Sequence, residues 1–248
     1  MVILRTPAEI EQMRRAGSLV GQVLERLREH VAPGVSTREL DAIAENMICS
    51  RGGVPSFKGY RGYPAPICAS VNNEIIHGIP GDRMLVDGDI ISIDCGAMLG
   101  GYHGDAAMTF PVGPVSAEAE KLMTVTREAL NAGIAMARLK MRLGDIGNAI
   151  QRHVEANGFS VVRDFVGHGI GRHMHEDPQI PNFGPAGMGM RLRTGMVLAI
   201  EPMVNAGGHE VVVMDDGWTA CTRDGSLSAH FEHTVAITDD GPEVLTLP

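Results

Sequence analysis

Four acidic side chains lie inside apolar, strand-like stretches of this 248-residue sequence. Asp94 and Asp105 belong to SIDCGAMLGGYHGDAAMTF in the first half, and Glu201 and Glu232 lie in similar stretches of the second half. A buried carboxylate is unfavourable unless an opposite charge or hydrogen-bond donors compensate it. Because carboxylate oxygens are good ligands for divalent ions, these acids indicate a metal site. The alternative, four solvated acids on an exposed face, fits the apolar surroundings less well.

The two aspartates are predicted to face each other across a β-hairpin. Residues 88–97 and 102–111 have the pattern of two strands, and the glycines between them can adopt the positive φ of a tight turn. If Leu99 and Gly100 are the turn residues, the aspartates lie directly opposite, with Cβ atoms about 4.5–5.5 Å apart. Like charges at that distance are destabilising, so a cation is expected between them.

The segment FVGHGIGRHMHEDP supplies imidazole nitrogens in the second half. His168 is a candidate nitrogen ligand, and His175 follows seven residues later. Histidine-rich loops are often only polar surface, so neither residue is decisive alone. Four carboxylates and one imidazole suit two divalent ions, which can lower the pKa of a bridging water and polarise a carbonyl. Such a site indicates hydrolysis with a metal-bound hydroxide as nucleophile. Serine-hydrolase and P-loop chemistry have no local support, because the sequence has neither a serine-hydrolase elbow nor a phosphate-binding P-loop.

Four helices are expected to support these strands. The first begins after Thr6, and its segment ends at Gly34; the second begins after Ser36, and a glutamate three residues after each cap completes a capping box. In the second half, Ser116 can cap a third helix, and Gly158 with the preceding asparagine closes a shorter fourth one. Apolar residues recur with helical spacing in each segment, so each helix has one face to bury.

The order of elements repeats, which favours an internal duplication. LVDGDIISID, residues 85–94, aligns without gaps on LRTGMVLAIE, residues 192–201, so that the final aspartate falls on the final glutamate. Further along each half, HGD resembles HFE. We therefore expect an α/β (α+β) chain that forms a single domain, with pseudo-repeat halves of roughly residues 6–113 and 114–248.

Composition restricts the remaining function classes. The net charge of −9 gives no broad attraction to nucleic acid or to anionic membranes. No apolar run reaches the length of a transmembrane helix, and MVILRTPAEIEQMRRAG has no signal-peptide core. The four cysteines form no C-x-x-C pair, which fits reduced thiols and a cytoplasmic location. We expect neither a nucleic-acid substrate nor a membrane partner.

The sequence resembles the methionine aminopeptidases, in particular their short bacterial type I form. The resemblance covers nearly the whole chain and rests on NNEIIHGIP, ISIDCG, GYHGD, GHGIGRHMHEDP, AIEPM and FEHTVAIT, in that order and at the family's spacing. It implies the pita-bread fold, a single catalytic domain with two pseudo-symmetric halves around a central dinuclear metal site. It also implies removal of N-terminal methionine from nascent proteins and peptides when the second residue is small and uncharged, by attack of a metal-bridging water.

The resemblance further implies roles for the candidate ligands. Asp94 would chelate one ion, Asp105 and Glu232 would bridge both ions, and His168 and Glu201 would bind the other. Glu201 would also act as the general base toward the bridging water. Fe, Mn, Co or Zn all suit such a donor set.

The resemblance also implies the groups that contact substrate. His77 and His175 match the family's two non-ligand catalytic histidines, which hold the scissile amide and stabilise the tetrahedral intermediate. The implied methionine pocket consists of aromatic and sulfur-bearing residues: Phe57, Tyr60, Tyr63, Cys68, Met174 and Trp218. The chain departs from the family at Met174, where many members carry Phe.

Further expectations concern relatives and partners. Only 26 positions separate His175 from Glu201, too few for the insertion of type II enzymes, and the absence of an extra N-terminal domain speaks against aminopeptidase P and prolidase. Family members can bind a monovalent cation (Na or K) near Asn72 and Ser228, can contact the ribosome, and are expected to be monomers. The alternative function is a catalytically inactive pita-bread module that binds peptides or proteins, which would be expected to have lost metal ligands.

Overall fold

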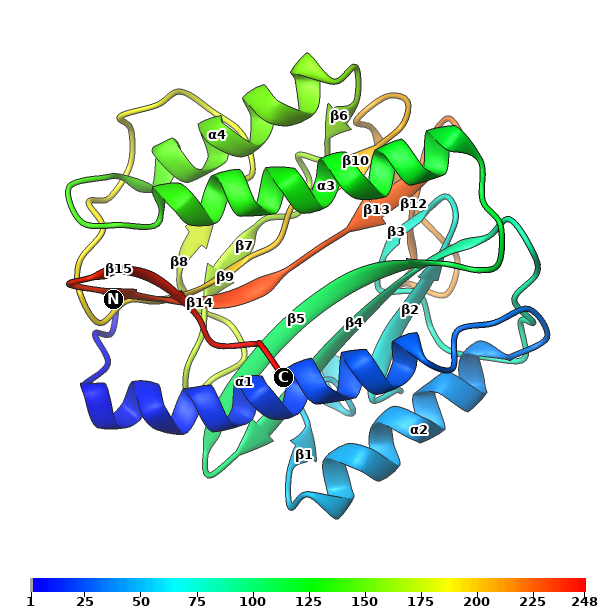
Figure 1. Cartoon of the computed structure of the whole chain (residues 1–248), viewed down its shortest axis with the longest axis horizontal. Coiled ribbons are helices and arrows are strands. Elements are labelled where there is room, and N and C mark those ends of the chain that lie inside the picture. The colour runs from blue at the N-terminus through cyan, green and yellow to red at the C-terminus, as the bar shows by residue number, and fades with distance from the viewer. Residues whose placement is uncertain (1) are drawn as a thin grey trace.

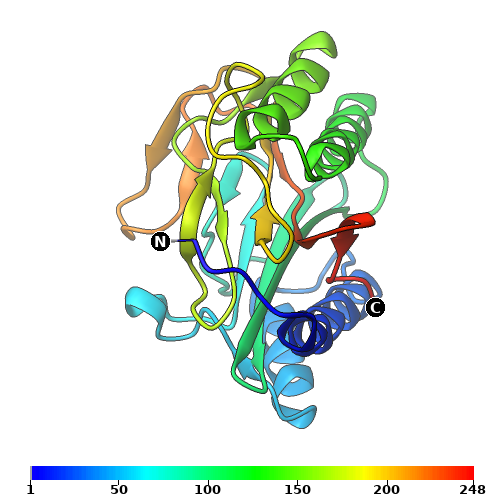
Figure 2. The same ribbon diagram turned by 90° about the vertical axis from the view of Figure 1, so that its left-hand side faces the viewer.

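Two helix pairs cover one face of the strands in the computed structural model, which describes residues 2–248 (Figures 1 and 2). The helices are α1 (Pro7–Arg28), α2 (Thr37–Ser50), α3 (Ala117–Met136) and α4 (Leu143–Ala156). The α1–α2 pair comes from the first half of the chain and the α3–α4 pair from the second, and the strands run between them (Figure 1). Within residues 2–248, no helix combines the length and the apolar character that crossing a membrane requires.

The helix starts confirm the capping predictions. The hydroxyl groups of Thr6 and Ser36 accept hydrogen bonds from the backbone three residues later, and the glutamates there bond back, forming two capping boxes. Ser116 caps α3 through its hydroxyl, which accepts from the N–H of Ala119, without a returning side-chain bond. The predicted end of the first segment at Gly34 is wrong for the helix itself, because α1 ends at Arg28. A proline follows at position 33, and a residue that precedes proline is disfavoured in helical conformation.

The strands form one four-stranded, one five-stranded and two three-stranded sheets within residues 2–248. The first-half sheet contains β1, β2, β4 and β5, and the five-stranded sheet has the order β15-β14-β9-β7-β8. A short 3₁₀ turn, η1, spans Tyr60–Gly62. The strand bounds are β1 Val54–Pro55, β2 Ile67–Val71, β3 Glu74–Ile76, β4 Ile90–Leu99, β5 Tyr102–Pro111, β6 Ser160–Val161, β7 Gly167–Gly169, β8 Glu176–Ile180, β9 Val197–Ile200, β10 Met203–Asn205, β11 Val211–Val213, β12 Ala220–Thr222, β13 Ser228–His230, β14 His233–Thr238 and β15 Gly241–Val244.

The β4–β5 hairpin exists, but its predicted register is wrong by two positions. Leu99 pairs with Tyr102, so the turn residues are Gly100 and Gly101, with φ of 61° and 81°. Two successive positive φ values define the type I′ turn that joins twisted strands, and glycine adopts them without steric cost. Asp94 therefore pairs with Ala107, and Asp105 lies diagonally across the ladder on the same face.

The second half contains a counterpart of the β4–β5 hairpin, in which each of the two long strands is interrupted. β9 and β10 run antiparallel to β14 and β13 in one continuous register, with Ile200 opposite His233 and Met203 opposite His230. That register places Glu201 directly opposite Glu232 in the gap between the paired segments. The direct pairing predicted for the aspartates thus occurs between the glutamates. The two hairpins differ by two positions in register.

Hydrogen bonds join the two hairpins side by side. The backbone N–H of Glu232 donates to the carbonyl of Ala107 at 2.9 Å, and the N–H of Asp105 donates to the hydroxyl of Thr234 at 3.0 Å. The Thr234 hydroxyl donates in turn to the carbonyl oxygen of Asp105 at 2.8 Å. β5 and the β13–β14 segment are therefore neighbours, and this junction brings all four acids together.

Each helix pair has its own apolar core. One cluster packs α1 and α2 on β2, β4 and β5, and the other packs α3 and α4 on the second-half strands. Met108 of β5 packs against both clusters. This division agrees with two similar halves, while the boundary between residues 113 and 114 stays a prediction. Fully buried members include Leu24, Ile48, Ile91 and Ile93 in the first cluster and Leu122, Ile150, Leu198 and Val235 in the second.

The contact between α1 and β5 allows a stability test. A Cβ atom on Gly104 would lie 2.6 Å from the backbone nitrogen of Gly17, which helix α1 holds in place. We expect Gly104→Ala to lower the free energy of unfolding by about 1–3 kcal/mol, because backbone must move to accept the methyl group. Gly81→Ala is the matched control, since a Cβ there meets no atom within 4 Å and its φ is not positive. Equal urea midpoints for the two variants would contradict this packing.

Candidate metal centre

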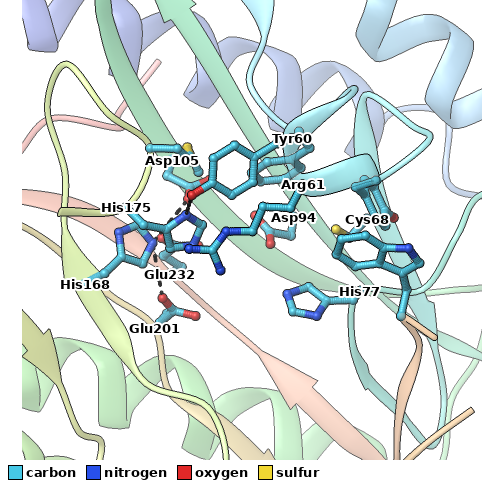
Figure 3. Close-up of a pocket in the computed structure, with 14 residues that line it drawn as sticks. Tyr60, Arg61, Cys68, His77, Asp94, Asp105, His168, His175, Glu201 and Glu232 are labelled. Atoms are coloured by element: carbon cyan, nitrogen blue, oxygen red, sulfur yellow. Dashed lines mark hydrogen bonds and ion pairs between the residues drawn. The ribbon is translucent and has the colours of Figure 1, made fainter.

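The side chains of the four acids meet in one cavity of about 130 Å³ (Figure 3). Asp94 and Asp105 project from β4 and β5, Glu201 follows the last residue of β9, and Glu232 lies between β13 and β14. His168, in β7, lines the same cavity. The two hairpins and a strand of the second half therefore supply five candidate ligands to a single point.

His168 presents a nitrogen lone pair to the acids. Its Nδ1 lies 2.9 Å from the carbonyl oxygen of Gly169, which can only accept, so Nδ1 carries the proton. Its Nε2 lies 3.6 Å from Glu201 Oε1 and 3.8 Å from Asp105 Oδ2. Burial lowers the pKa of His168 to about 4, so the ring is neutral at pH 7. A neutral imidazole is the form that ligates metals.

The carboxyl groups pay a large electrostatic penalty without a cation. Burial raises the pKa of Asp94 to about 7. Burial, together with repulsion from the neighbouring acids, raises the pKa of Asp105, Glu201 and Glu232 well above the usual range. Each of these groups would ionise readily only if a positive charge were placed among them.

Unpaired buried atoms support the fit to a metal ion. Asp94 Oδ1, Asp105 Oδ1 and Glu232 Oε1 are buried and have no hydrogen-bond partner among residues 2–248. Buried polar atoms nearly always have partners, so three such oxygens in one cavity need an explanation. Ligand atoms of Asp105, His168 and Glu232 also lie within 4.8 Å of one another. Oxygen and imidazole donors at this spacing fit a divalent ion.

The other end of the cavity is apolar. Phe57, Cys68 and Met174 are buried there, and the rings of Tyr63 and Trp218 meet edge to face with centroids 5.1 Å apart. The Tyr63 hydroxyl donates to a backbone carbonyl at 2.9 Å, which fixes the ring. Such a wall suits a flexible apolar side chain, and a thioether in particular.

Two further histidines border the cavity without a place among the acids. His175 Nδ1 lies 2.9 Å from the Tyr60 hydroxyl, and its ring centroid lies 4.2 Å from that of His168. Burial, with a smaller contribution from His168, lowers the pKa of His175 to about 3. His77 has a φ of 60° and lies edge-on to Trp218, and burial lowers its pKa as well. Both rings are neutral at pH 7.

The loop that carries His175 is tied to the N-terminal segment and to β5. Arg5 and Glu176 form an ion pair in which both side chains are buried. Arg172 donates to the Tyr102 hydroxyl at 2.6 Å, and its guanidinium lies over the same ring. Since both contacts flank His175 in sequence, they restrict where its ring can lie.

The structure brings every predicted site residue to this cavity. The residues from the sequence analysis that line it are Phe57, Tyr60, Tyr63, Cys68, His77, Asp94, Asp105, His168, Met174, His175, Glu201, Trp218 and Glu232. Their individual roles stay predictions, since location alone does not assign a function.

Two neighbouring residues were missed by the sequence analysis. Arg61 also lines the cavity, and a single charged residue between glycines in KGYRGYP was the available signal. His230 is buried, with its Nε2 unpaired and 3.8 Å from Glu201 Oε2. His230 is the first residue of the HFE motif, but that motif was used only to predict its glutamate as a ligand.

Comparison with known proteins assigns the family. The sequence profile of metallopeptidase family M24 matches residues 11–239. The chain belongs to this family. Among M24 relatives, a methionine aminopeptidase of Clostridium perfringens is 60% identical over 247 residues, which cover 100% of this chain and 99% of that protein. Methionine aminopeptidase 1 of Bacillus subtilis is 56% identical over 246 residues, or 99% of each.

Solved structures confirm the M24 fold. A methionine aminopeptidase from Thermotoga maritima superimposes with a TM-score of 0.99 at 47% identity and covers 100% of both chains. A prolidase from Pyrococcus horikoshii has a TM-score of 0.79 at 22% identity and covers 99% of this chain but 64% of that one, which shows the fold alone. The predicted family, pita-bread fold and enzyme class, a metal-dependent hydrolase, are confirmed.

The raised carboxyl pKa values predict how the metal-free M24 chain responds to pH. Acids with a raised pKa bind protons more tightly when folded, so their contribution to stability is complete below the unfolded pKa of about 4. It is lost as pH rises through the folded values, which is about 7 for Asp94. In chelator at pH 8, we expect Asp94→Asn to raise the free energy of unfolding by about 1–3 kcal/mol, because a buried charge is removed. Urea titration at pH 5, 6.5 and 8 measures both effects.

The wild-type chain is the control for this comparison. The advantage of Asp94→Asn should shrink toward pH 5, where the wild-type Asp94 carboxyl holds its proton. A divalent ion added at pH 8 should stabilise the wild type more than the variant. An advantage independent of pH would contradict the proposed titration.

Proposed function

We propose that this chain is a methionyl aminopeptidase, which removes the N-terminal methionine of peptides and nascent proteins when the second residue is small and uncharged. One observation carries the proposal: the buried acids and the neutral His168 share a cavity of about 130 Å³ with a wall of aromatic and sulfur-bearing side chains. The wall suits the methionine thioether. The cavity's small volume leaves little room for a large second residue.

The acid cluster would hold two divalent ions. Asp94 would bind one ion, His168 and Glu201 the other, and Asp105 and Glu232 both. The ions, when bound, supply Lewis acidity that activates water and polarises the scissile carbonyl. The donor set suits Fe, Mn, Co or Zn.

The surrounding side chains would bind and orient the peptide. Glu201 would accept the proton of the attacking water as the general base. With the Tyr60 hydroxyl donating to Nδ1 of His175, the Nε2–H of that ring is left to donate to the oxygen that gains charge. His77 would hold the scissile amide from the opposite rim, beside Trp218.

The apolar wall would bind the methionine side chain. Three of its members, Phe57, Cys68 and Met174, are at most 8% exposed, so they contribute a dry surface. Met174 takes the place of the Phe that many family members have, and its flexible side chain can follow the shape of the substrate. Tyr60, Tyr63 and Trp218 would complete the pocket.

Several finer expectations accompany the proposal. An inactive binding module is less well supported, because the relatives of 54–60% identity are named as the enzyme and the ligand set is whole. A monovalent cation would bind near Asn72 and Ser228, where the Ser228 N–H donates to the Asn72 carbonyl at 2.9 Å. We propose a cytoplasmic monomer that meets its substrates as nascent chains, with contact to the ribosome.

The reaction can be tested with two peptides. Metal-loaded protein should release methionine from Met-Gly-Met-Met and at least about tenfold more slowly from Met-Leu-Met-Met, since a steric difference of roughly 1.4 kcal/mol is tenfold in rate. Free methionine is quantified by chromatography with each of the four metals. Failure to cleave the first peptide with any of them would favour the inactive binding module.

Three histidine variants separate catalytic groups from ligands. His175→Ala and His77→Ala should lower kcat by about 10²–10³ while metal content stays near that of the wild type, because each removes one donor. His168→Ala should lose metal affinity as well as activity. Calorimetric metal titration beside turnover measures the two effects. Loss of metal by His175→Ala, to the extent seen for His168→Ala, would place His175 among the ligands.

A further inference from the structure

We propose that Arg61 forms a subsite at the mouth of the cavity that binds a carboxylate of the peptide substrate, on a residue beyond the second position. The inference rests on the proposed function and extends it from the N-terminal methionine to the following chain. Its ligand class is an acidic side chain, glutamate or aspartate.

The backbone at Arg61 adopts a conformation that arginine rarely takes. Its φ is 50° and its ψ is 20°, in the left-handed region that favours glycine. Glycines at 59 and 62 flank the turn, with φ of 84° and 93°, and the N–H of Gly59 donates to the carbonyl of Tyr63 at 2.7 Å. A side chain kept at a left-handed position beside a site points to a role for that side chain.

Packing directs this side chain along the cavity. The guanidinium carbon of Arg61 lies 5.3 Å from the centroid of the Tyr60 ring, within cation–π range. The Tyr60 ring in turn stacks on His175, with centroids 5.2 Å apart and planes 20° apart. Figure 3 shows the three side chains clustered at the cavity, where Arg61 extends past Tyr60 toward the space between His175 and Asp94. The charge is therefore held beside a proposed catalytic group.

The Arg61 guanidinium pairs with no carboxylate in the part of the chain that the structure describes. Arg61 makes no ion pair or side-chain hydrogen bond within residues 2–248. Arg172 offers a contrast, because it stacks on Tyr102 in the same way but also donates to the hydroxyl of that ring at 2.6 Å. A guanidinium presents a planar fork of donors that matches a carboxylate in a bidentate pair. The donors of Arg61 are thus available to a ligand.

The position of Arg61 decides which substrate residue it would meet. The proposed methionine wall and the acids occupy the closed part of the cavity, whereas Arg61 is exposed at its mouth. An acidic second residue would approach the cluster of Asp94, Asp105, Glu201 and Glu232. An acidic third or fourth residue would instead lie at the mouth, within reach of a long, flexible guanidinium side chain.

Amidated peptides test the subsite without a terminal carboxylate. The series is Met-Ala-Xaa-Ser-amide and Met-Ala-Ser-Xaa-amide, with Xaa as Glu, Gln or Lys. For the metal-loaded wild type in 20 mM salt, we expect kcat/KM for Glu to exceed that for Gln by about two- to fivefold in at least one series, as an exposed charge pair with good geometry provides. The ratio should fall toward one in 500 mM salt, because the interaction is screened.

Variants of Arg61 identify the source of the preference. Arg61→Gln should bring the Glu-to-Gln ratio to about one, Arg61→Lys should keep part of it, and Arg61→Glu should favour Lys. Arg26→Gln is the matched control, since it removes one exposed positive charge on α1 that pairs with Glu29 at 2.8 Å. That control should keep the wild-type ratio.

Three results would overturn the subsite, and a fourth concerns the proposed function. A wild-type ratio near one in both series, or an unchanged ratio in Arg61→Gln, contradicts an acidic subsite at Arg61. A ratio lowered equally by Arg26→Gln would assign the preference to overall charge and overturn the inference too. Release of methionine from none of the peptides would contradict the aminopeptidase function itself, and the subsite with it.

Discussion

Four carboxylates buried at one point form the constraint on which this structure depends. Neither hairpin could bury its pair of acids alone at neutral pH without loss of stability, because ions removed from water need compensation. The hydrogen bonds between Ala107 and Glu232, and between Asp105 and Thr234, fix the edge at which the two halves meet. The helix pairs then cover the remaining apolar faces of the strands, with one core cluster on each side. Folding thus gathers four acids in one cavity, where a cation would stabilise their ionised forms.

The same burial sets the ionisation of the neighbouring histidines in the opposite direction. Low dielectric raises the pKa of the acids and lowers that of His168 and His175, so the metal-free cavity favours neutral forms throughout. Neutral imidazoles can ligate through a lone pair or donate through the remaining N–H, depending on which nitrogen is engaged. Here Gly169 orients His168 toward the acids, and Tyr60 contacts Nδ1 of His175. One environment therefore prepares two histidines for two roles.

Local patterns in the sequence were sufficient to predict where α1, α2 and α3 start, because a cap depends on residues three positions apart. The residues that line the cavity were predicted from the resemblance to a known family, because its motifs identify site residues that lie far apart in the sequence. Hairpin register did not follow, since Leu99-Gly100 and Gly100-Gly101 are both possible turns in the sequence. The choice between them depends on the ladder and on the β5 junction with the second half. Arg61 was missed because its position at the cavity depends on stacking against the Tyr60 ring, and a contact of this kind leaves no periodic pattern in the sequence.

The two-residue difference in register between the two hairpins bears on whether the chain could derive from, or be redesigned as, a homodimer of one half. In a symmetric dimer of one half, both hairpins would have the same register, so the two acids of each hairpin would be diagonal in both or directly opposed in both. In this chain the aspartates are diagonal and the glutamates are directly opposed. If the halves descend from one gene, their divergence is therefore recorded in the backbone ladder as well as in the side chains. No exchange of single residues would restore equivalence. A designer seeking a homodimeric precursor would have to move one hairpin by two residues along its partner.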